Sequence, residues 1–423
     1  MDSYQPKPLF KGIPFHAQQF SREQIANAGW NILQEDLPLP CAIIKKHALL
    51  QNSLRMNQWL ERNDLLLAPH IKTTMSPELI FEQLADGVWG LTVANVTNSR
   101  LAAQMGAKHI IFANQLVGRA NIKEVELLLA EYPDLIMYLF IDSLDAFELL
   151  KAANIKNRGR LKLLIELGAY GGRCGVREAA TAKTLIEAIY TNQWEIAGFS
   201  AYEAVFEGSD EQKQSSVQDF LSLLDSTICA FIEQQTIVPA QSLIISIGGS
   251  EYYDMCALTF ARLQHEYDAK IVLRSGCYLF SDSGVYEKAS MAIDDRLGSA
   301  QLTLPASESA IEVWCYVLSQ PEPGVVILGA GKRDFSYDKG LPKPLYAKSK
   351  LSSKITPIDH TNYQITRIND QHCFLKVPID DSLAPGDMVA VGISHPCTTF
   401  DKWRKILIVD GQYNVIDAIQ AWF

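Results

Sequence analysis

Residues 65–77 read Leu-Leu-Leu-Ala-Pro-His-Ile-Lys-Thr-Thr-Met-Ser-Pro. The short apolar run at the start predicts a buried strand, and Pro69 ends it because proline cannot donate to a sheet ladder. Ser76 and Pro77 then suit the cap and the first position of a helix. This pattern places Lys72 at the end of a buried strand, where we expect a desolvated amine that can form a Schiff base with a carbonyl group. The same sequence pattern is also compatible with an ordinary surface lysine after a strand.

Outward from this stretch, short apolar runs recur at regular intervals and predict eight strands. The predicted strands are Leu65–Ala68, Val88–Val93, His109–Ala113, Leu135–Ile141, Leu161–Leu167, Glu195–Ala201, Leu243–Ile247 and Lys270–Leu273. Segments of helical spacing lie between them. These predicted helices are Pro77–Ala85, Val96–Met105, Asn121–Tyr132, Ser143–Lys151, Ala179–Thr191, Asp210–Gln235 and Tyr252–Glu266. Eight strands that alternate with helices favour an α/β fold, a TIM-like (β/α)8 barrel.

A doubly wound open sheet has nearly the same local pattern. No Gly-x-Gly-x-x-Gly opens a helix early in the chain, which argues against dinucleotide binding. Before these eight strands, Cys41-Ala-Ile-Ile44 predicts a further strand and His47–Glu61 a helix.

After residue 300 the pattern changes to short apolar runs separated by turn residues. They are Ala310–Leu318, Gly324–Leu328, His372–Val377, Met388–Val391 and Ile406–Val409. We therefore expect a second, mostly β domain at the C-terminal end.

Composition excludes several classes of partner. The chain has 423 residues, 20% of them charged and 48% hydrophobic, and a formal net charge of -10. This charge argues against nucleic-acid and anionic-membrane partners. No run approaches the length of a membrane helix and no signal peptide is visible. Eight scattered cysteines without a Cys-x-x-Cys pair favour reduced thiols in a cytoplasmic enzyme.

Two glycine-containing loops follow the last two predicted barrel strands. They read Ser246-Ile-Gly-Gly-Ser250 and Arg274-Ser-Gly-Cys-Tyr278. In a barrel of this type, the loops after strands 7 and 8 are the usual phosphate site. Glycine lets backbone N–H groups approach a phosphate, and hydroxyl groups add donors. Together with Lys72, these loops predict a phosphate-bearing cofactor, although either loop alone commonly just turns a chain.

Two further segments carry candidate polar groups. Residues 166–175 end in Gly-Gly-Arg-Cys-Gly, whose Arg173 can bind a cofactor oxygen or a substrate carboxylate. Tyr202 follows the sixth strand, where a phenol can lie under a cofactor ring. A solvated arginine and a packed tyrosine are the alternatives.

Near the C-terminal end, the chain reads Ser394-His-Pro-Cys-Thr-Thr-Phe-Asp401. The imidazole of His395 and the thiolate of Cys397 can both reach one borderline-soft cation. Two ligands make a weak metal motif, and a buried cysteine beside a hydrogen-bonded histidine is the common alternative.

Taken together, these motifs resemble the D-serine dehydratase / D-threonine aldolase-like enzymes, which are fold-type III pyridoxal phosphate (PLP) enzymes related to alanine racemase. The resemblance rests on the order of Pro69-His-Ile-Lys72-Thr, Gly172-Arg-Cys-Gly175, the two glycine loops and His395-Pro-Cys397. The chain looks closest to the bacterial amino acid deaminases of this group. Ala113-Asn-Gln115 and Gly331-Lys-Arg-Asp334 support that likeness.

The resemblance implies a PLP-binding barrel over residues 38–295 and a β-domain built from residues 1–37 and 296–423. It implies that Lys72 holds PLP as a Schiff base, that Tyr202 lies near the pyridine nitrogen and that Arg173 approaches the phenolic oxygen. A divalent metal, zinc or manganese, would bind His395 and Cys397, and the usual assembly is a homodimer. The implied cofactor-binding residues are Lys72, His70, Arg173, Tyr202, Ser246, Gly248, Gly249, Ser250, Ser275, Gly276, Cys277 and Tyr278.

The implied activity is that of a lyase which deaminates a D-β-hydroxy amino acid, such as D-serine or D-threonine, to a 2-keto acid and ammonia. A D-threonine aldolase that gives glycine and an aldehyde is the alternative, and a non-catalytic PLP-binding protein is another. One departure stands out, because many members have His-Lys where this chain has Thr74-Met75. A detailed mechanism therefore does not carry over from those members.

Overall fold

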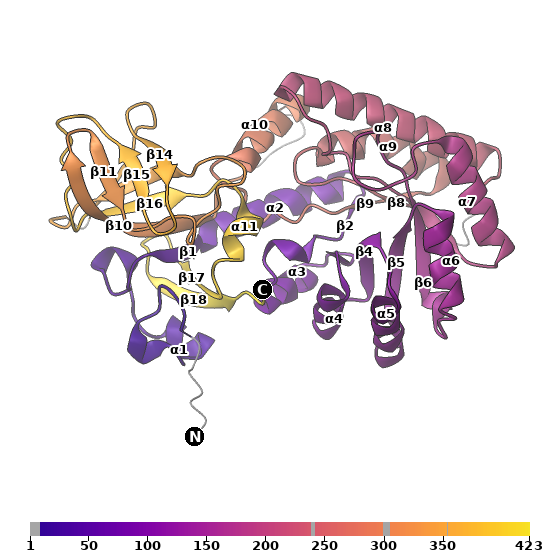
Figure 1. Ribbon diagram of the computed structural model, residues 1–423, viewed down its shortest axis with the longest axis horizontal. Coiled ribbons are helices and arrows are strands. Elements are labelled where there is room, and N and C mark those ends of the chain that lie inside the picture. The colour runs from indigo at the N-terminus through magenta and orange to yellow at the C-terminus, as the bar shows by residue number, and fades with distance from the viewer. Residues whose placement is uncertain (1–8, 238–241, 299–304, 353) are drawn as a thin grey trace.

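The computed structural model describes residues 9–237, 242–298, 305–352 and 354–423. Two bodies lie side by side, a barrel surrounded by helices and a β-domain (Figure 1). The first eight residues of the predicted β-domain segment 1–37 lie outside the described residues, as do residues 299–304 and 353 of the segment 296–423.

Eight parallel strands form the barrel in the order β2-β9-β8-β7-β6-β5-β4-β3. Their bounds are β2 Leu66–Leu67, β3 Leu91–Val93, β4 His109–Gln115, β5 Ile136–Ile141, β6 Leu161–Glu166, β7 Ile196–Ser200, β8 Ile244–Ser246 and β9 Lys270–Leu273. Each predicted strand is confirmed, within a few residues at its ends. The strands are short, apolar and almost wholly buried, as parallel strands covered on both faces must be.

The ring closes between its first two strands in sequence. Trp89 donates its N–H to the carbonyl of Leu67 at 2.9 Å, and Thr92 donates its N–H to Pro69 at 3.0 Å. A parallel bridge also pairs His70 with Thr92. The sheet is therefore a nearly closed barrel, and the open doubly wound alternative is wrong.

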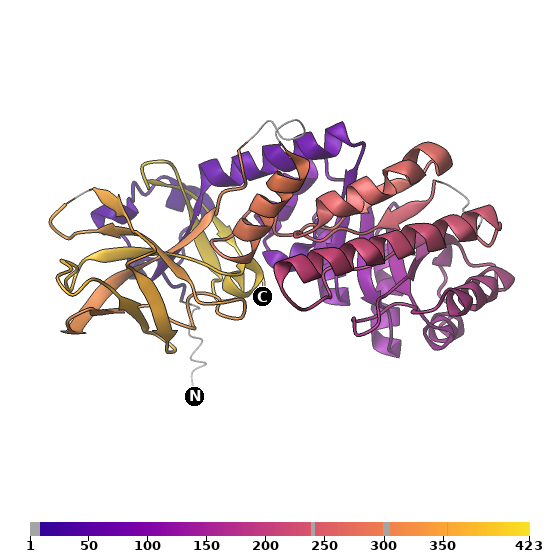
Figure 2. The same ribbon diagram turned by 90° about the horizontal axis from the view of Figure 1, so that it is seen from above.

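Helices surround the barrel, as Figures 1 and 2 show. They are α3 Pro77–Ala85, α4 Val96–Gln104, α5 Arg119–Glu131, α6 Leu144–Ala152, α7 Ala179–Thr191, α8 Asp210–Glu233, α9 Tyr253–Tyr267 and α10 Val285–Leu297. Side-chain caps fix several starts: Asn95 accepts an N–H of α4, Ser143 one of α6, and Ser209 forms a capping box with Gln212 at α8.

The β-domain contains a ten-stranded sheet with the main order β13-β12-β16-β10-β1-β17-β18, to which β11, β14 and β15 are joined through β10. Its strands are β1 Cys41–Lys45, β10 Ile311–Glu322, β11 Val325–Leu328, β12 Lys343–Lys348, β13 Ile355–Pro357, β14 Gln364–Ile368, β15 Cys373–Lys376, β16 Met388–Gly392, β17 Lys405–Val409 and β18 Val415–Gln420. The five strands expected after residue 300 are present. Four others, β12, β13, β14 and β18, were not predicted.

Strand β1 lies within the range predicted for the barrel, yet it pairs in the β-domain with β10 and β17. The helix α2 (Lys46–Arg62) then runs from this sheet toward the barrel (Figure 2), and α1 (Arg22–Ala26) lies beside β18 (Figure 1). The short helix α11 (Pro396–Phe400) lies at the face of the β-domain that meets the barrel. The two bodies thus share a boundary, and the predicted metal residues lie on it.

Candidate functional site

A cavity of about 460 Å³ opens at the carboxyl ends of the barrel strands, on the side that faces the β-domain. Most of the predicted site residues line it. These are His70, Lys72, Arg173, Tyr202, Gly249, Ser250, Gly276, Cys277, His395 and Cys397. Residues from both bodies therefore meet around one space, which is of the size that a small-molecule site needs.

The other predicted residues lie behind this lining. Ser246 accepts a hydrogen bond from Arg274 at 2.9 Å, and Ser275 donates to the carbonyl of Gly249 at 2.8 Å. Tyr278 accepts a hydrogen bond from Gln83 at 3.2 Å. Gly248 has a φ of +89°, a conformation that favours glycine. These contacts help to fix the shape of the two glycine loops, and Ser275 and Tyr278 also line a smaller adjoining cavity together with Ser250 and Cys277. That Ser246, Gly248, Ser275 and Tyr278 bind a cofactor stays a prediction.

The segment that follows β2 and contains Lys72 forms a single 3-10 turn, η3 (Ile71–Thr73). The ring Nδ1 of His70 accepts the N–H of Lys72 at 3.4 Å and caps this turn. The side chain of Lys72 is exposed to the cavity. The expected desolvation is therefore wrong for this structure, because the turn directs the amine away from the buried strand into open space.

His70 is held neutral by its surroundings. Burial disfavours the charged imidazolium, and the nearby cations Lys72, Arg274 and Arg173 act in the same direction, so the pKa of His70 lies well below its usual range. Nδ1 accepts a hydrogen bond, which agrees with a neutral ring that carries its proton on Nε2.

The loop that carries Arg173 is fixed by a second arginine. Arg177 donates to the carbonyls of Cys174 and Gly175, each at 2.6 Å. This bracing leaves Arg173 exposed, and its guanidinium lies 4.6 Å from the ring centroid of Tyr202. The two residues that the resemblance places at different edges of a cofactor ring thus stack on each other here.

Tyr202 and its neighbour Glu203 occupy the floor of the site. Burial, together with the carboxylates of Glu203 and Glu251, raises the pKa of Tyr202 to about 12, so the phenol stays protonated at neutral pH. Glu203 is fully buried and accepts the backbone N–H groups of Gly248 at 3.3 Å and Gly249 at 2.6 Å. The Glu203 carboxylate therefore fixes the backbone of the 246–250 loop by hydrogen bonds.

Arg274 is a buried cation that feels the charges of Glu203 and Glu166. It donates to the carbonyl of Ala201 at 2.6 Å as well as to Ser246. Burial lowers the pKa of Arg274, while the charges of Glu203 and Glu166 oppose this effect. The guanidinium also lies 5.3 Å from the ring centroid of Phe140, which lines the cavity.

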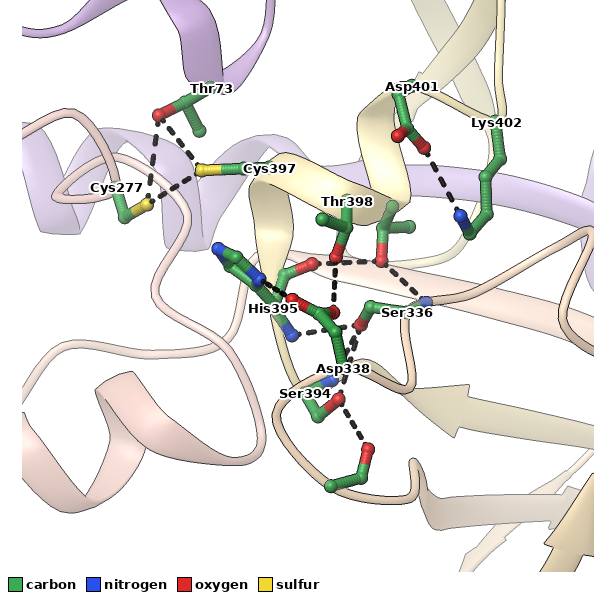
Figure 3. Close-up of polar contacts among 12 residues, drawn as sticks. Thr73, Cys277, Ser336, Asp338, Ser394, His395, Cys397, Thr398, Asp401 and Lys402 are labelled. Atoms are coloured by element: carbon green, nitrogen blue, oxygen red, sulfur yellow. Dashed lines mark hydrogen bonds and ion pairs between the residues drawn. The ribbon is translucent and has the colours of Figure 1, made fainter. Parts of the chain in front are cut away.

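On the β-domain side of the cavity, His395 is the N-cap residue of α11 and is held by two polar contacts. Its backbone N–H donates to the buried hydroxyl of Ser336 at 2.9 Å, and its Nδ1 lies 2.7 Å from a carboxylate oxygen of Asp338 (Figure 3). Burial opposes the charged ring, but hydrogen bonds with Cys397 and Asp338 outweigh it and raise the pKa of His395 to about 9. Because Asp338 contacts Nδ1, the other ring nitrogen, Nε2, is the one available to a metal.

The Cys397 sulfur lies near a second thiol. It is 3.6 Å from the sulfur of Cys277, which comes from the barrel, and it donates to the hydroxyl of Thr73 at 3.4 Å (Figure 3). Hydrogen bonds with Cys277, and then with His395 and Thr73, lower the pKa of Cys397 against the opposing effect of burial. Cys397 is therefore the thiol of this pair that ionises first.

Across the cavity, Asp142, Glu166 and Cys174 place one ligand atom each within 4.8 Å of one another. Their carboxylates already have partners, because Asp142 accepts the N–H of Gly175 at 3.0 Å and Glu166 accepts from Gln115. Burial raises the pKa of Glu166. We interpret this group as the support of the Arg173 loop.

Sequence reasoning missed several residues around the cavity. Arg274 opens one of the quoted loops, so its place after a strand was a usable signal. Thr73 stands in the quoted lysine motif, but nothing in the motif signals its contact with Cys397. Asp338, Glu203 and Glu251 lie in no motif, and only the fold brings them to the site.

The residues present fit PLP. A free lysine amine faces a cavity of suitable volume, and the two glycine loops are joined by the N–H of Cys277, which donates to Ser250 at 3.2 Å. A Cβ atom at Gly276 would lie 2.6 Å from the carbonyl of His70 and 2.8 Å from the hydroxyl of Thr73, so the glycine allows this loop to lie against the lysine turn. The imidazole and thiolate of His395 and Cys397 equally suit a divalent metal.

Comparisons with known proteins agree with this architecture. The chain is 25% identical over 378 residues to the D-threonine aldolase of Arthrobacter sp, a match that covers 88% of this chain and 89% of that enzyme. It is 21% identical over 404 residues to the D-threo-3-hydroxyaspartate dehydratase of Delftia sp. (strain HT23), covering 91% and 98%. The crystal structure of D-threonine aldolase from Filomicrobium marinum shares the fold, with a TM-score of 0.71 at 20% identity, covering 93% of this chain and 96% of that chain.

Two family models match. The alanine racemase N-terminal domain matches residues 44–256, about half of the chain, and a putative serine dehydratase domain matches residues 310–409. The first match covers the lysine turn and most of the barrel, and the second covers the segment with His395 and Cys397. The chain therefore belongs to the alanine racemase N-terminal domain family, and its barrel is followed by a putative serine dehydratase domain.

Proposed function

We propose that this chain is a PLP- and metal-dependent lyase that deaminates a D-β-hydroxy amino acid to a 2-keto acid and ammonia. The observation that carries the proposal is one cavity lined by Lys72 of the barrel and by His395 and Cys397 of the β-domain. A lysine that can hold the cofactor and a pair of metal ligands are thus presented to the same small substrate. The lyases among the similar proteins support this class of reaction.

PLP would be held by Lys72, with its phosphate at the loops of Ser250 and Gly276, and when bound it supplies an electron sink for the substrate α-carbon. The Nζ atom of Lys72 then has two roles, attachment of the cofactor and acceptance of the α-proton once it is free. Its exposure to the cavity allows both. His70 stays neutral beside it and adds no competing charge.

Arg173 and Tyr202 complete the binding surface. The Arg173 guanidinium is exposed to the cavity and can form a charge-assisted pair with a carboxylate. Tyr202 presents a protonated phenol, which donates a hydrogen bond without adding charge. A neutral partner of this kind limits charge storage on a cofactor ring, which favours early loss of a β-substituent.

His395 and Cys397 would hold the divalent metal, which supplies Lewis acidity toward the β-hydroxyl of the substrate. Asp338 orients the imidazole, and the low pKa of Cys397 supplies the thiolate that a metal needs. Nitrogen and sulfur donors favour zinc over manganese.

The alternative within the same class is a D-threonine aldolase, favoured by the 25% identity to the Arthrobacter enzyme. In that reaction the β-hydroxyl loses its proton and the bond between the α- and β-carbons breaks. The same lysine, arginine and metal pair would serve both outcomes.

We also propose a homodimer, which rests on the family resemblance, and a cytoplasmic location. All eight cysteines are free thiols, as expected in a reducing compartment. Among the described residues, no helix is both long and apolar enough to cross a membrane.

The test is product identification. The PLP-loaded protein is mixed with D-serine, D-threonine and their L-forms, with and without a chelator, and 2-keto acid, ammonia, glycine and aldehyde are measured. Keto acid and ammonia from a D-substrate, lost with the chelator, support the dehydratase. Glycine with an aldehyde moves the chain to the aldolase, and no turnover of any of the four would contradict the proposal and favour a PLP-binding protein without catalysis.

A further inference from the structure

The sulfur of Cys277 belongs to the barrel, yet it contacts the metal-binding segment of the β-domain. Its distance to the sulfur of Cys397 is 3.6 Å, and the hydroxyl of Thr73 lies 3.7 Å from Cys277 and 3.4 Å from Cys397 (Figure 3). Cys277 is fully enclosed, with 4% of its surface exposed, and it lines the cavity. A second thiol therefore lies beside the first, at the same wall as the imidazole of His395.

The separation of the two sulfurs suits a shared ion. Zinc–sulfur bonds of about 2.3 Å at a tetrahedral angle place two sulfurs roughly 3.8 Å apart. A disulfide would need about 2.05 Å. The observed 3.6 Å is close to the first value and far from the second.

We propose that Cys277 is a third protein ligand of the metal, so that the site is formed by His395, Cys397 and Cys277. This inference rests on the proposed function and refines its metal site. Three protein ligands leave one tetrahedral position free, which is the arrangement of catalytic zinc sites, and the free position would take the β-hydroxyl of the substrate. Two sulfur ligands make the site soft and select zinc over manganese or magnesium. Each thiol releases its proton to solvent as it binds the ion.

The site needs one adjustment to close around an ion. Among the described residues, the set with three ligand atoms already within 4.8 Å of one another is Asp142, Glu166 and Cys174, not this one. A side-chain rotation must therefore bring the His395 imidazole and the two sulfurs together. The backbone of Cys277 is fixed meanwhile, because its N–H donates to Ser250 at 3.2 Å. The backbone N–H of Cys277 would thus stabilise the loop proposed to bind the cofactor, while its sulfur binds the metal.

X-ray absorption at the zinc K-edge tests the proposal, because it counts sulfur neighbours without any turnover. The PLP-loaded protein receives one equivalent of Zn²⁺, and the wild type should show two sulfur neighbours at about 2.3 Å. Cys277→Ser should show one. Cys174→Ser, which removes another thiol of the same cavity, should keep two.

One sulfur per zinc in the wild type would overturn the proposal, and this result does not depend on any variant folding. Two sulfurs in both the wild type and Cys277→Ser would overturn it as well, as would a Cys277–Cys397 disulfide in the zinc-loaded protein by mass spectrometry. The lyase assay separates the two claims. Turnover with one sulfur per zinc rejects this ligand alone, and two sulfurs without turnover reject the proposed reaction alone.

Discussion

The contact between Asp338 and His395 shows how one exposed carboxylate can prepare a metal ligand. Its oxygens lie 2.7 Å from the ring Nδ1 of His395 and 2.6 Å from the hydroxyl of Thr398, which donates to it. The imidazole is thereby held in one orientation, with Nε2 directed elsewhere. Outer partners of this kind commonly contribute one to two orders of magnitude to metal affinity.

Replacing Asp338 should therefore weaken metal binding without removing a ligand. We predict that Asp338→Asn raises the zinc dissociation constant about 10- to 100-fold, measured by competition with a chromogenic chelator. Asp401→Asn is the matched control, because Asp401 lies at the end of the same helix and pairs with Lys402 instead. Equal affinities for wild type and Asp338→Asn would contradict this role.

The neutral state of His70 makes stability depend on pH. In the unfolded chain His70 takes up a proton below its ordinary pKa of about 6.5, whereas in the folded chain its pKa is much lower and it stays neutral. The unfolded state thus binds more protons in this window, so the free energy of unfolding falls as pH falls below about 6.5.

We predict that His70→Gln removes this contribution. Between roughly pH 4.5 and 6.5, the free energy of unfolding of the variant should fall less steeply than that of the wild type, by up to about 1.4 kcal/mol per pH unit. Urea titrations across this range measure it, with the exposed His360→Gln as the control. Parallel profiles for wild type and His70→Gln would show that His70 titrates normally in the folded protein.

Sequence motifs predicted the side chains that line the cavity better than the residues that hold these side chains by hydrogen bonds. Short patterns in the sequence point to Lys72, Arg173, Tyr202, His395 and Cys397, and the fold brings these side chains to one cavity. Their partners come from distant parts of the chain and carry no local signal. Ser336, for example, accepts the N–H groups of Ser394 and His395 from a segment 58 and 59 residues earlier.

At the scale of elements, strand β7 depends on a glycine. Gly198 has a φ of +154°, and a Cβ atom there would lie 1.9 Å from the carbonyl oxygen of Ile244 in the neighbouring strand β8. That oxygen belongs to the backbone and cannot rotate away. The close approach of these two strands therefore requires a residue without a side chain.

Gly198→Ala should force the two strands apart. We predict a loss of about 1–3 kcal/mol in the free energy of unfolding, measured by chemical denaturation. Gly159→Ala is the control, because nothing lies within 4 Å of its Cβ position, and its effect should stay within about 0.5 kcal/mol. A similar small effect for both variants would contradict the steric account.

Element periodicity predicted the barrel well because its strands are mostly buried and its helices amphipathic. Several strands of the β-domain were not predicted, because they lack a clear contrast between buried apolar and exposed polar positions. In β14, for example, only Ile365 and Ile368 are buried, and in β13 none of the three residues is. Short strands of this kind are defined by their partners more than by their own residues.

At the scale of the whole molecule, the β-domain joins segments from both ends of the described chain. Strand β1 lies between β10 and β17 and pairs with both. No periodicity within residues 41–45 indicates which sheet they join. The strand itself was predicted, but the range 38–295 counted it with the barrel, whereas it pairs in the β-domain. The position of helix α11, which carries the proposed metal ligand Cys397, in turn depends on how this domain meets the barrel.

One aromatic pair lies at that junction. Phe280 of the barrel and Phe400 of α11 are both fully buried, with ring centroids 4.7 Å apart in an edge-to-face arrangement. Phe400→Ala should lower the free energy of unfolding by about 3–5 kcal/mol and should also raise the zinc dissociation constant, since α11 carries Cys397. Phe81→Ala, at an exposed aromatic residue, is the control. Destabilisation without any change in zinc affinity would show that the metal pair does not depend on this contact.

Lys72 is the residue proposed to hold the cofactor, and the rest of the proposed chemistry depends on it. The PLP-loaded protein is reduced with borohydride, digested, and searched by mass spectrometry for the lysine that carries the cofactor. Lys339 lines the same cavity and provides an internal comparison. We predict that the label lies on Lys72; a label on Lys339, or none on either lysine, would contradict the central claim.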